Sequence, residues 1–144
     1  HPFGAVLVHN GKVVATSENT VNTDDDFSRH AEINLMVHAR RTLPKDVIRN
    51  STVYVSTAPC PSCTSVMAEQ GIVKIVYGVH YVQFNKRLGI KGKILPCDIL
   101  YEMLGRKVEF IGPVLEAEGV QVFDHWPESD ANARWVRQAK TQGN

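Results

Sequence analysis

Two short segments of this chain, separated by about one helix and one strand, carry side chains that together can bind one metal ion. The segment His30–Glu32 brings an imidazole and a carboxylate, and Pro59–Cys63 brings two thiols in a C-x-x-C spacing. Imidazole and thiolate are ligands that zinc prefers. A structural zinc takes four protein ligands, whereas a catalytic zinc takes three and leaves the fourth position to water. The count here predicts an open zinc site formed by His30, Cys60 and Cys63.

The size and charge of the chain favour one globular domain that acts on a small molecule. With 144 residues, 43% of them hydrophobic, residues 1–144 can form a single domain with a substantial core. The 16 Lys and Arg nearly balance the 15 Asp and Glu, so no strong field gathers nucleic acid or an acidic membrane. Three cysteines suit a reducing compartment, and no apolar run reaches the ~20 residues that cross a bilayer. We therefore expect a cytoplasmic protein without membrane contact.

The first part of the chain predicts a hairpin and a buried helix. Two β-branched apolar runs, over about 3–9 and 12–16, flank Asn10-Gly11, a pair that tolerates the positive φ angles of a type I′ turn. An apolar stripe that includes Leu35 then predicts a helix over about 28–41. The strands should pair antiparallel, and the helix should be largely buried.

A strand–helix–strand order follows and indicates the fold class. Residues 51–56 alternate as a strand, and a helix over about 62–70 can be ended by Gly71. Residues 72–79 are expected to form a fully buried strand, parallel to the first and joined to it by the helix. This pattern predicts an α/β protein in which helices and a sheet form a layered sandwich.

The second half of the chain gives weaker signals. Residues 83–93 are polar and contain glycine, so they are expected to form a solvated loop or a lid. Their cationic side chains are Lys86, Arg87, Lys91 and Lys93. A helix over 95–104 and a fifth strand over 107–111 follow. Residues 113–144 are expected to form a C-terminal tail in which only 130–142 looks helical.

Glu32 is not one of the three expected zinc ligands, so its carboxylate is available for another role. Residues i and i+2 point to different sides inside a helix, but at a helix start side chains can reach past the end, so His30 and Glu32 can face one site. The N–H groups and dipole at the start of the next helix favour the thiolates of Cys60 and Cys63. Zinc lowers the pKa of a bound water to about 7. Glu32 is then the expected proton carrier.

Three other interpretations are open from the residues alone. Zinc can staple two helices without catalysis, with Glu32 capping a helix start. Cys60 and His30 can form a nucleophile pair without metal, which would leave one thiol idle. Cys97 can be proposed as a fourth ligand, although a single cysteine on a helix is more often a small buried hydrophobic residue.

The two ligand segments match the H-x-E and P-C-x-x-C signature of zinc-dependent nucleobase deaminases. The segments Pro2–Val8, Glu18-Asn19 and Val53–Thr57 extend the match, so that about residues 2–80 resemble the cytidine deaminase-like superfamily. The branch is that of guanine deaminases, bacterial tRNA adenosine deaminases and fungal cytosine deaminase. The resemblance implies a three-layer α/β/α sandwich with a five-stranded mixed sheet, bound Zn²⁺, hydrolytic loss of ammonia and a homodimer.

The resemblance also implies substrate contacts. Asn19 would bind the substrate ring or its sugar, the backbone N–H of Ala31 would hold a ring carbonyl, and Phe3 would help to wall the pocket. Alternatively, Asn19 is a turn residue that bonds its own loop.

The chain departs from the family pattern in several places. Ala58 stands where Glu often precedes Pro-Cys, and the family's first helix, ahead of the strand that contains Phe3, is missing from this numbering. The lysine-threonine-glycine loop and aromatic-rich terminal helix of the tRNA enzymes are not evident after Tyr77. Three aromatic residues resemble the tail with which guanine deaminases cover a neighbouring subunit's pocket, or pack as ordinary aromatic residues. They are Phe123, Trp126 and Trp135.

The sequence therefore predicts zinc-dependent hydrolytic deamination of a small nucleobase or nucleoside, with guanine or cytosine as the best guesses. One alternative is a tRNA adenosine deaminase, for which the cationic segment 83–93 is the candidate contact with nucleic acid. Another is a non-catalytic, zinc-stabilised interaction module.

Overall fold

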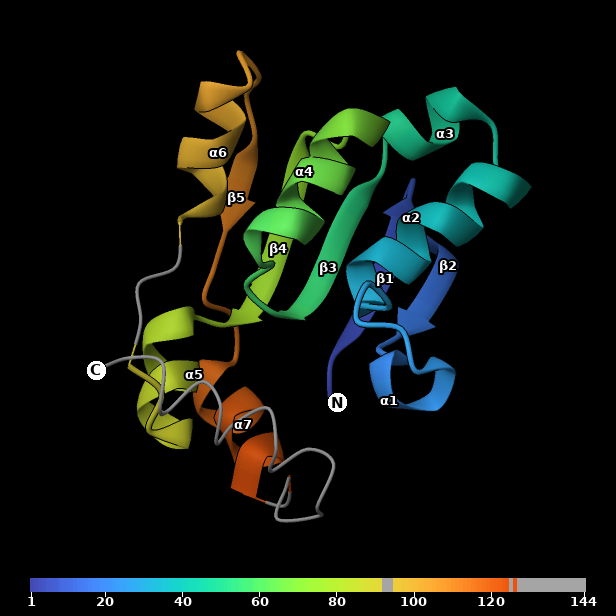
Figure 1. Ribbon diagram of the computed structural model, residues 1–144. Helices are drawn as coiled ribbons and strands as arrows, with labels where there is room; N and C mark the ends of the chain where they lie inside the picture. The colour runs from blue at the N-terminus through green and yellow to red at the C-terminus, as the bar shows by residue number, and fades with distance from the viewer. Residues whose placement is uncertain (92–94, 125, 127–144) are drawn as a thin grey trace.

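The computed structural model describes residues 1–91, 95–124 and 126, and its centre is a five-stranded mixed sheet (Figure 1). The strand order is β2-β1-β3-β4-β5. The strands are β1 (Gly4–His9), β2 (Lys12–Glu18), β3 (Thr52–Thr57), β4 (Lys74–Val79) and β5 (Glu109–Ile111). β1 pairs antiparallel with β2 and β3, whereas β3, β4 and β5 run parallel. The α/β class and the five-stranded mixed sheet are thus confirmed.

Local backbone preferences produce the turn and the helix end that the sequence predicts. Asn10 and Gly11 have φ angles of 49° and 72°, as a type I′ turn requires, and β1 and β2 pair on either side of them. Gly71 ends α4 (Pro61–Gln70) with a φ of 82°, and its backbone N–H bonds to the Ala68 carbonyl. Glycine suits this left-handed position because it carries no Cβ.

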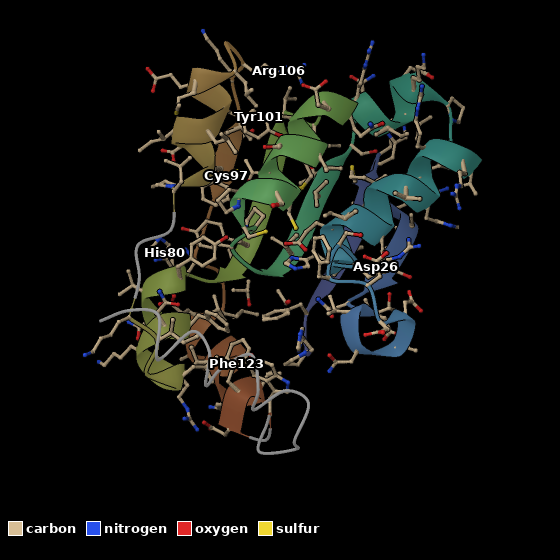
Figure 2. All side chains as sticks on the ribbon, viewed as in Figure 1. Asp26, His80, Cys97, Tyr101, Arg106 and Phe123 are labelled. Carbon is tan, nitrogen blue, oxygen red and sulfur yellow. The ribbon has the colours of Figure 1, made fainter. Side chains whose placement is uncertain are left out.

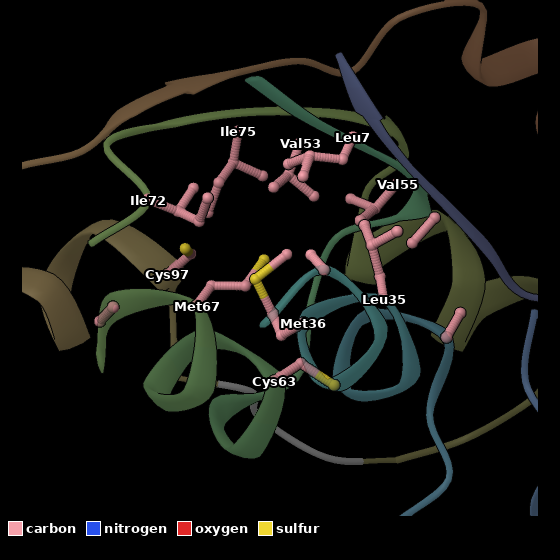
Figure 3. Close-up of a cluster of buried hydrophobic side chains, with 14 of the residues drawn as sticks. Leu7, Leu35, Met36, Val53, Val55, Cys63, Met67, Ile72, Ile75 and Cys97 are labelled. Carbon is pink, nitrogen blue, oxygen red and sulfur yellow. The ribbon is translucent and has the colours of Figure 1, made fainter. Parts of the chain in front are cut away.

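Helices α2 (Ala31–Thr42), α3 (Lys45–Arg49), α4 and α6 (Cys97–Met103) cover one face of the sheet (Figure 1). The main core lies between these helices and the strands (Figure 3). Its fully buried side chains include Leu7, Leu35, Met36, Val53, Met67 and Ile75. This packing holds α2 and α4 side by side, and both helices begin at the edge of the sheet where β3 and β4 finish.

The opposite face of the sheet carries apolar side chains that the described helices of this layer do not cover (Figure 1). Val6, Tyr54 and Val76 lie on that face and line a shallow apolar hollow of about 470 Å³. Tyr54 is 43% exposed there.

The predicted loop over residues 83–93 is wrong for its first half, because Tyr81–Leu88 forms helix α5. Its apolar residues Tyr81, Phe84 and Leu88 recur at helical spacing, and the last two are buried. His80 caps the helix by accepting a hydrogen bond from the Val82 N–H. The segment is rich in cationic side chains, so its composition suggests a loop although its apolar residues have helical spacing. Lys93 lies outside the described residues.

The remaining differences concern short helices and element ends. The sequence does not predict α1 (Val21–Asp24), α3, α7 (Glu116–Gln121) or the 3-10 turn Val122–Asp124. The helix expected from residue 28 begins only at Ala31, because Ser28 bonds back to Asp26 through both its N–H and its hydroxyl. The helix expected over 130–142 lies outside the described residues.

Truncation of a core methionine tests the packing of α2. Met36 is 1% exposed, whereas Met103 on α6 is 72% exposed, so Met36→Ala and Met103→Ala remove the same atoms from different environments. We expect Met36→Ala to lower the free energy of unfolding by about 2–5 kcal/mol and Met103→Ala to change it by less than about 0.5 kcal/mol. Urea denaturation of both variants measures this difference. Equal losses would contradict the core described here.

Candidate active site

His30 and Cys60 occupy the N-cap positions of α2 and α4. Both residues have extended backbone, with φ angles of −67° and −69°, and neither side chain caps its own helix. Their carbonyls still accept the first helical hydrogen bonds, from the N–H groups of Asn34 and Thr64. Because the usual capping role of these side chains is given up, the imidazole and the thiol turn toward one another between the two helix starts.

The distances within this group fit one tetrahedral zinc ion. The Cys60 and Cys63 sulfurs are 3.5 Å apart, and the His30 Nδ1 lies 3.6 Å from the first and 3.5 Å from the second. Zinc–sulfur bonds of about 2.3 Å and zinc–nitrogen bonds of about 2.0 Å in a tetrahedron separate the ligand atoms by about 3.5–3.8 Å. Among the described residues, these three form the one such group of potential ligands. The described residues thus supply three of the four ligands of a tetrahedral site.

The ionisation of the cluster also suits a cation. The hydrogen bond between the Cys60 and Cys63 sulfurs, followed by the one with His30, lowers the pKa of Cys60 to about 4. The same hydrogen bond to Cys60, followed by burial, raises the pKa of Cys63. The contact with Cys60 also raises the pKa of His30. A thiolate on Cys60 therefore draws protons onto its two neighbours, and a metal ion can take the place of those protons.

Glu32, the second residue of α2, lies beside this cluster without belonging to it. The residue is only 9% exposed, and burial raises the pKa of its carboxyl group. Its own backbone N–H and the Cys63 thiol donate hydrogen bonds to the carboxylate and oppose that shift. A buried carboxyl group that is poised in this way can both accept and return a proton.

A cavity of about 130 Å³ opens in front of the cluster. Its lining comes from β1, β3, α5 and the starts of α2 and α4, and comprises Phe3, Gly4, Asn19, His30, Glu32, Ser56, Thr57, Ala58, Cys60, Tyr81 and Phe84. The ring of Phe3 packs edge-on against Phe84, with centroids 5.8 Å apart. The cavity thus has one wall of metal ligands and carboxylate and another of aromatic rings, which suits a flat heterocycle.

Asn19 lines this cavity and also bonds its own turn. Its Oδ1 accepts a hydrogen bond from the Val21 N–H at 3.2 Å, which is the local role that the sequence left open. With Oδ1 held in this way, the amide nitrogen is the end of the side chain that can donate to a ligand. The two interpretations of Asn19 are therefore compatible.

Ala31 and Cys97 occupy different places from the cavity lining. Ala31 is the first residue of α2, between His30 and Glu32, and its side chain is buried in the core. Cys97 is buried at the start of α6 and lies outside the three-ligand group (Figure 2). The prediction that Cys97 is a buried hydrophobic residue agrees with this placement.

Several lining residues, among them Thr57, Tyr81 and Phe84, were not named as site residues from the sequence. Phe84 could have been found from the helical spacing of Tyr81, Phe84 and Leu88 in a segment read as a loop. Thr57, at the end of β3, has a buried hydroxyl without a hydrogen-bond partner among the described residues. Burial, followed by the charge of Cys60, raises the pKa of Tyr81. No local pattern marks Tyr81, because it reaches the site through the topology of the sheet, whereas Thr57 lies in the segment Val53–Thr57 that resembles the family.

The aromatic residues that follow β5 pack within this chain and support the cavity from behind. Phe123 is buried near α7 (Figure 2) and contacts Phe84 and Phe3, with ring centroids 5.1 Å and 6.0 Å apart. Trp126 lies 6.0 Å from Phe3 by the same measure. The described part of the tail thus follows the interpretation as ordinary aromatic packing. Trp135 lies outside the described residues.

Comparison with known proteins agrees with this geometry. The family model of the cytidine and deoxycytidylate deaminase zinc-binding region matches residues 1–79, which include every member of the cluster. The chain belongs to this deaminase family. Zinc as the cofactor and hydrolytic deamination as the class of chemistry are thereby confirmed.

Relatives of this deaminase carry different substrate names. A tRNA-specific adenosine deaminase of Bacillus subtilis is 30% identical over 81% of the chain and 70% of its own length. A probable cytosine deaminase of Schizosaccharomyces pombe is 31% identical over 83% of the chain and 75% of its own length. A guanine deaminase of Bacillus subtilis is 37% identical, but over 43% of the chain and 40% of its own length.

Solved structures share the fold of this deaminase. The guanine deaminase from Nitrosomonas europaea superposes with a TM-score of 0.67 at 15% identity, over 97% of this chain and 73% of that one. None of the helices in the described part of the deaminase is long and apolar enough to cross a bilayer.

Metal analysis of cysteine variants tests the ligand set. We expect the purified deaminase to bind one zinc ion per chain, and Cys60→Ser to lose most of it because two ligands cannot hold zinc tightly. Cys97→Ala is the matched control, since it removes the buried thiol that lies outside the cluster. Zinc content is measured by atomic emission after gel filtration. Retention of zinc in Cys60→Ser, or its loss in Cys97→Ala, would contradict the assignment.

Proposed function

We propose that this protein catalyses zinc-dependent hydrolytic deamination of a small nucleobase or nucleoside, with guanine or cytosine as the first candidates. The observation that carries the proposal is the position of Glu32, a buried carboxyl group that shares one cavity with His30 and Cys60 but is not part of the ligand group. A purely structural zinc site, which only links two helices, does not require a buried carboxyl group beside its ligands.

The residues of the site divide the reaction between them. When bound, zinc supplies a Lewis acid that activates water near neutral pH. Glu32 accepts a proton from the attacking water and passes it to the ring nitrogen. It then carries the second proton, from the hydroxyl that has added to the ring carbon, to the amine, so that the C–N bond breaks, ammonia leaves and an oxo group replaces it. The shift of its pKa upward, caused by burial, helps Glu32 to hold that proton between the two transfers.

The other wall of the cavity suits recognition of the base. Phe3 and Phe84 offer apolar ring surface, against which a planar heterocycle can pack. The amide nitrogen of Asn19 can donate to a ring or sugar oxygen, and the backbone N–H of Ala31 stays the proposed partner of a ring carbonyl. A homodimer and a cytoplasmic location remain part of the proposal, as the sequence suggests them.

Adenosine deamination in tRNA is the second candidate, because the Bacillus relative of that name matches 81% of the chain. The net charge of +1 offers little general attraction for RNA. Ammonia release from cytosine, guanine, cytidine and adenosine, compared with inosine formation in a tRNA anticodon stem-loop, separates the two candidates. Turnover of the stem-loop alone would favour the second, and a steep loss of binding with salt would accompany it.

Replacement of Glu32 by Gln tests the proposed reaction. Gln keeps the size of the side chain but cannot carry the proton, so we expect ammonia release to fall by about 10²–10⁴-fold while zinc content and fold are kept. Activity and zinc content are measured on the same preparation.

Glu69→Gln is the control for the loss of a carboxylate, because the Glu69 side chain is 65% exposed and pairs with Arg106 at 3.0 Å, away from the cavity. We expect it to deaminate at the rate of the unchanged protein. Undiminished turnover in Glu32→Gln would show that another group moves the proton.

A further inference from the structure

Tyr81 occupies an unusual place at the edge of the catalytic cavity. It is the first residue of α5, directly after His80, which Figure 2 shows where β4 passes into α5. Its side chain lines the cavity that contains Glu32 and Cys60, and also an adjoining cavity of about 490 Å³. Among the described residues, Ala58 is the other one that lines both cavities. Tyr81 is therefore part of the partition between the two spaces.

The hydroxyl of Tyr81 has no hydrogen-bond partner in the described part of the chain, although its oxygen is buried. A buried polar group without a partner costs about 1–3 kcal/mol, so such groups are rare in folded proteins and call for an explanation. Tyr101 provides the contrast within the same chain. Its buried hydroxyl, on α6 (Figure 2), donates a 2.9 Å hydrogen bond to the Ile72 carbonyl.

The surroundings of Tyr81 indicate what could satisfy its hydroxyl. Cys60, Glu32 and Cys63 are near enough for their charges to act on the phenol, so the ring stands beside the reacting groups. Ala58, which lies next to it in the lining, has no polar side-chain atom. A phenol is protonated at neutral pH and can donate one hydrogen bond. The partner that the site lacks is thus a hydrogen-bond acceptor in the cavity itself.

We propose that the Tyr81 hydroxyl is a substrate-binding group, which donates a hydrogen bond to a ring nitrogen or carbonyl oxygen of the base held at the zinc site. This role rests on the proposed deaminase function and deepens it. The described part of the chain offers the hydroxyl no partner, and the substrate supplies one. The energy of that bond is realised only when a base with an acceptor on the Tyr81 side is in place, which makes Tyr81 a determinant of specificity.

The variants Tyr81→Phe and Tyr101→Phe test this role, since each removes one buried hydroxyl and no ring. For Tyr81→Phe we expect kcat/KM for the best substrate among cytosine, guanine, cytidine and adenosine to fall about tenfold, with an unchanged or higher melting temperature. For Tyr101→Phe we expect the reverse, a lower melting temperature and unchanged kcat/KM, because its hydroxyl already has a structural partner. A fall in melting temperature for Tyr81→Phe with unchanged kcat/KM would overturn the proposal.

A binding measurement separates this proposal from the proposed chemistry. Calorimetric titration of the same four compounds into zinc-loaded Glu32→Gln, and into Glu32→Gln with Tyr81→Phe, does not depend on turnover. We expect the second protein to bind the preferred compound about tenfold more weakly. Equal affinities would overturn the role of Tyr81, whereas undiminished turnover by Glu32→Gln alone would overturn the role of Glu32 and leave the binding comparison valid.

Discussion

The convergence of His30, Cys60 and Cys63 at the starts of two helices is the interaction on which the rest of the structure depends. His30 and Cys60 occupy N-cap positions without capping their helices, so the cost of those unmade caps, about 1 kcal/mol each, is accepted in favour of a metal site. Zinc binding in small zinc-dependent domains supplies about 10–16 kcal/mol, which is as large as the whole stability of a typical domain. The metal can therefore hold α2 and α4 in register far more strongly than the missing caps could.

The cavity in front of this cluster joins two parts of the chain with different tasks. The metal ligands and Glu32 come from the segment that matches the deaminase family model, residues 1–79. Tyr81 and Phe84 come from α5, and Phe123 supports them from the region after β5. The ligand group and Glu32 thus lie in the region that the family model matches, whereas Tyr81 and Phe84 add to the cavity lining from the part beyond it.

Residues with a local signature could be predicted from the sequence, and residues placed by topology could not. The turn, the helix end and the metal ligands could each be predicted from a short local pattern, at Asn10-Gly11, at Gly71 and in the two ligand segments. The strand–helix–strand order of the chain then indicates most of the sheet. Helix α5 was missed because four cationic side chains in residues 83–93 outweighed the apolar spacing of Phe84 and Leu88. Tyr81 enters the cavity only because β4 ends beside Glu32 and Cys60 in space, and that neighbourhood spans about fifty residues of sequence.

The measurement that tests the account most directly is a zinc titration of the metal-free protein, in which bound zinc and ammonia release from a preferred base are followed together. We expect activity to rise in proportion to bound zinc and to saturate at one ion per chain, since the proposed reaction needs one three-ligand site and one buried carboxylate. Full activity without zinc, or fully loaded protein that releases ammonia from no base, nucleoside or anticodon stem-loop, would contradict this account.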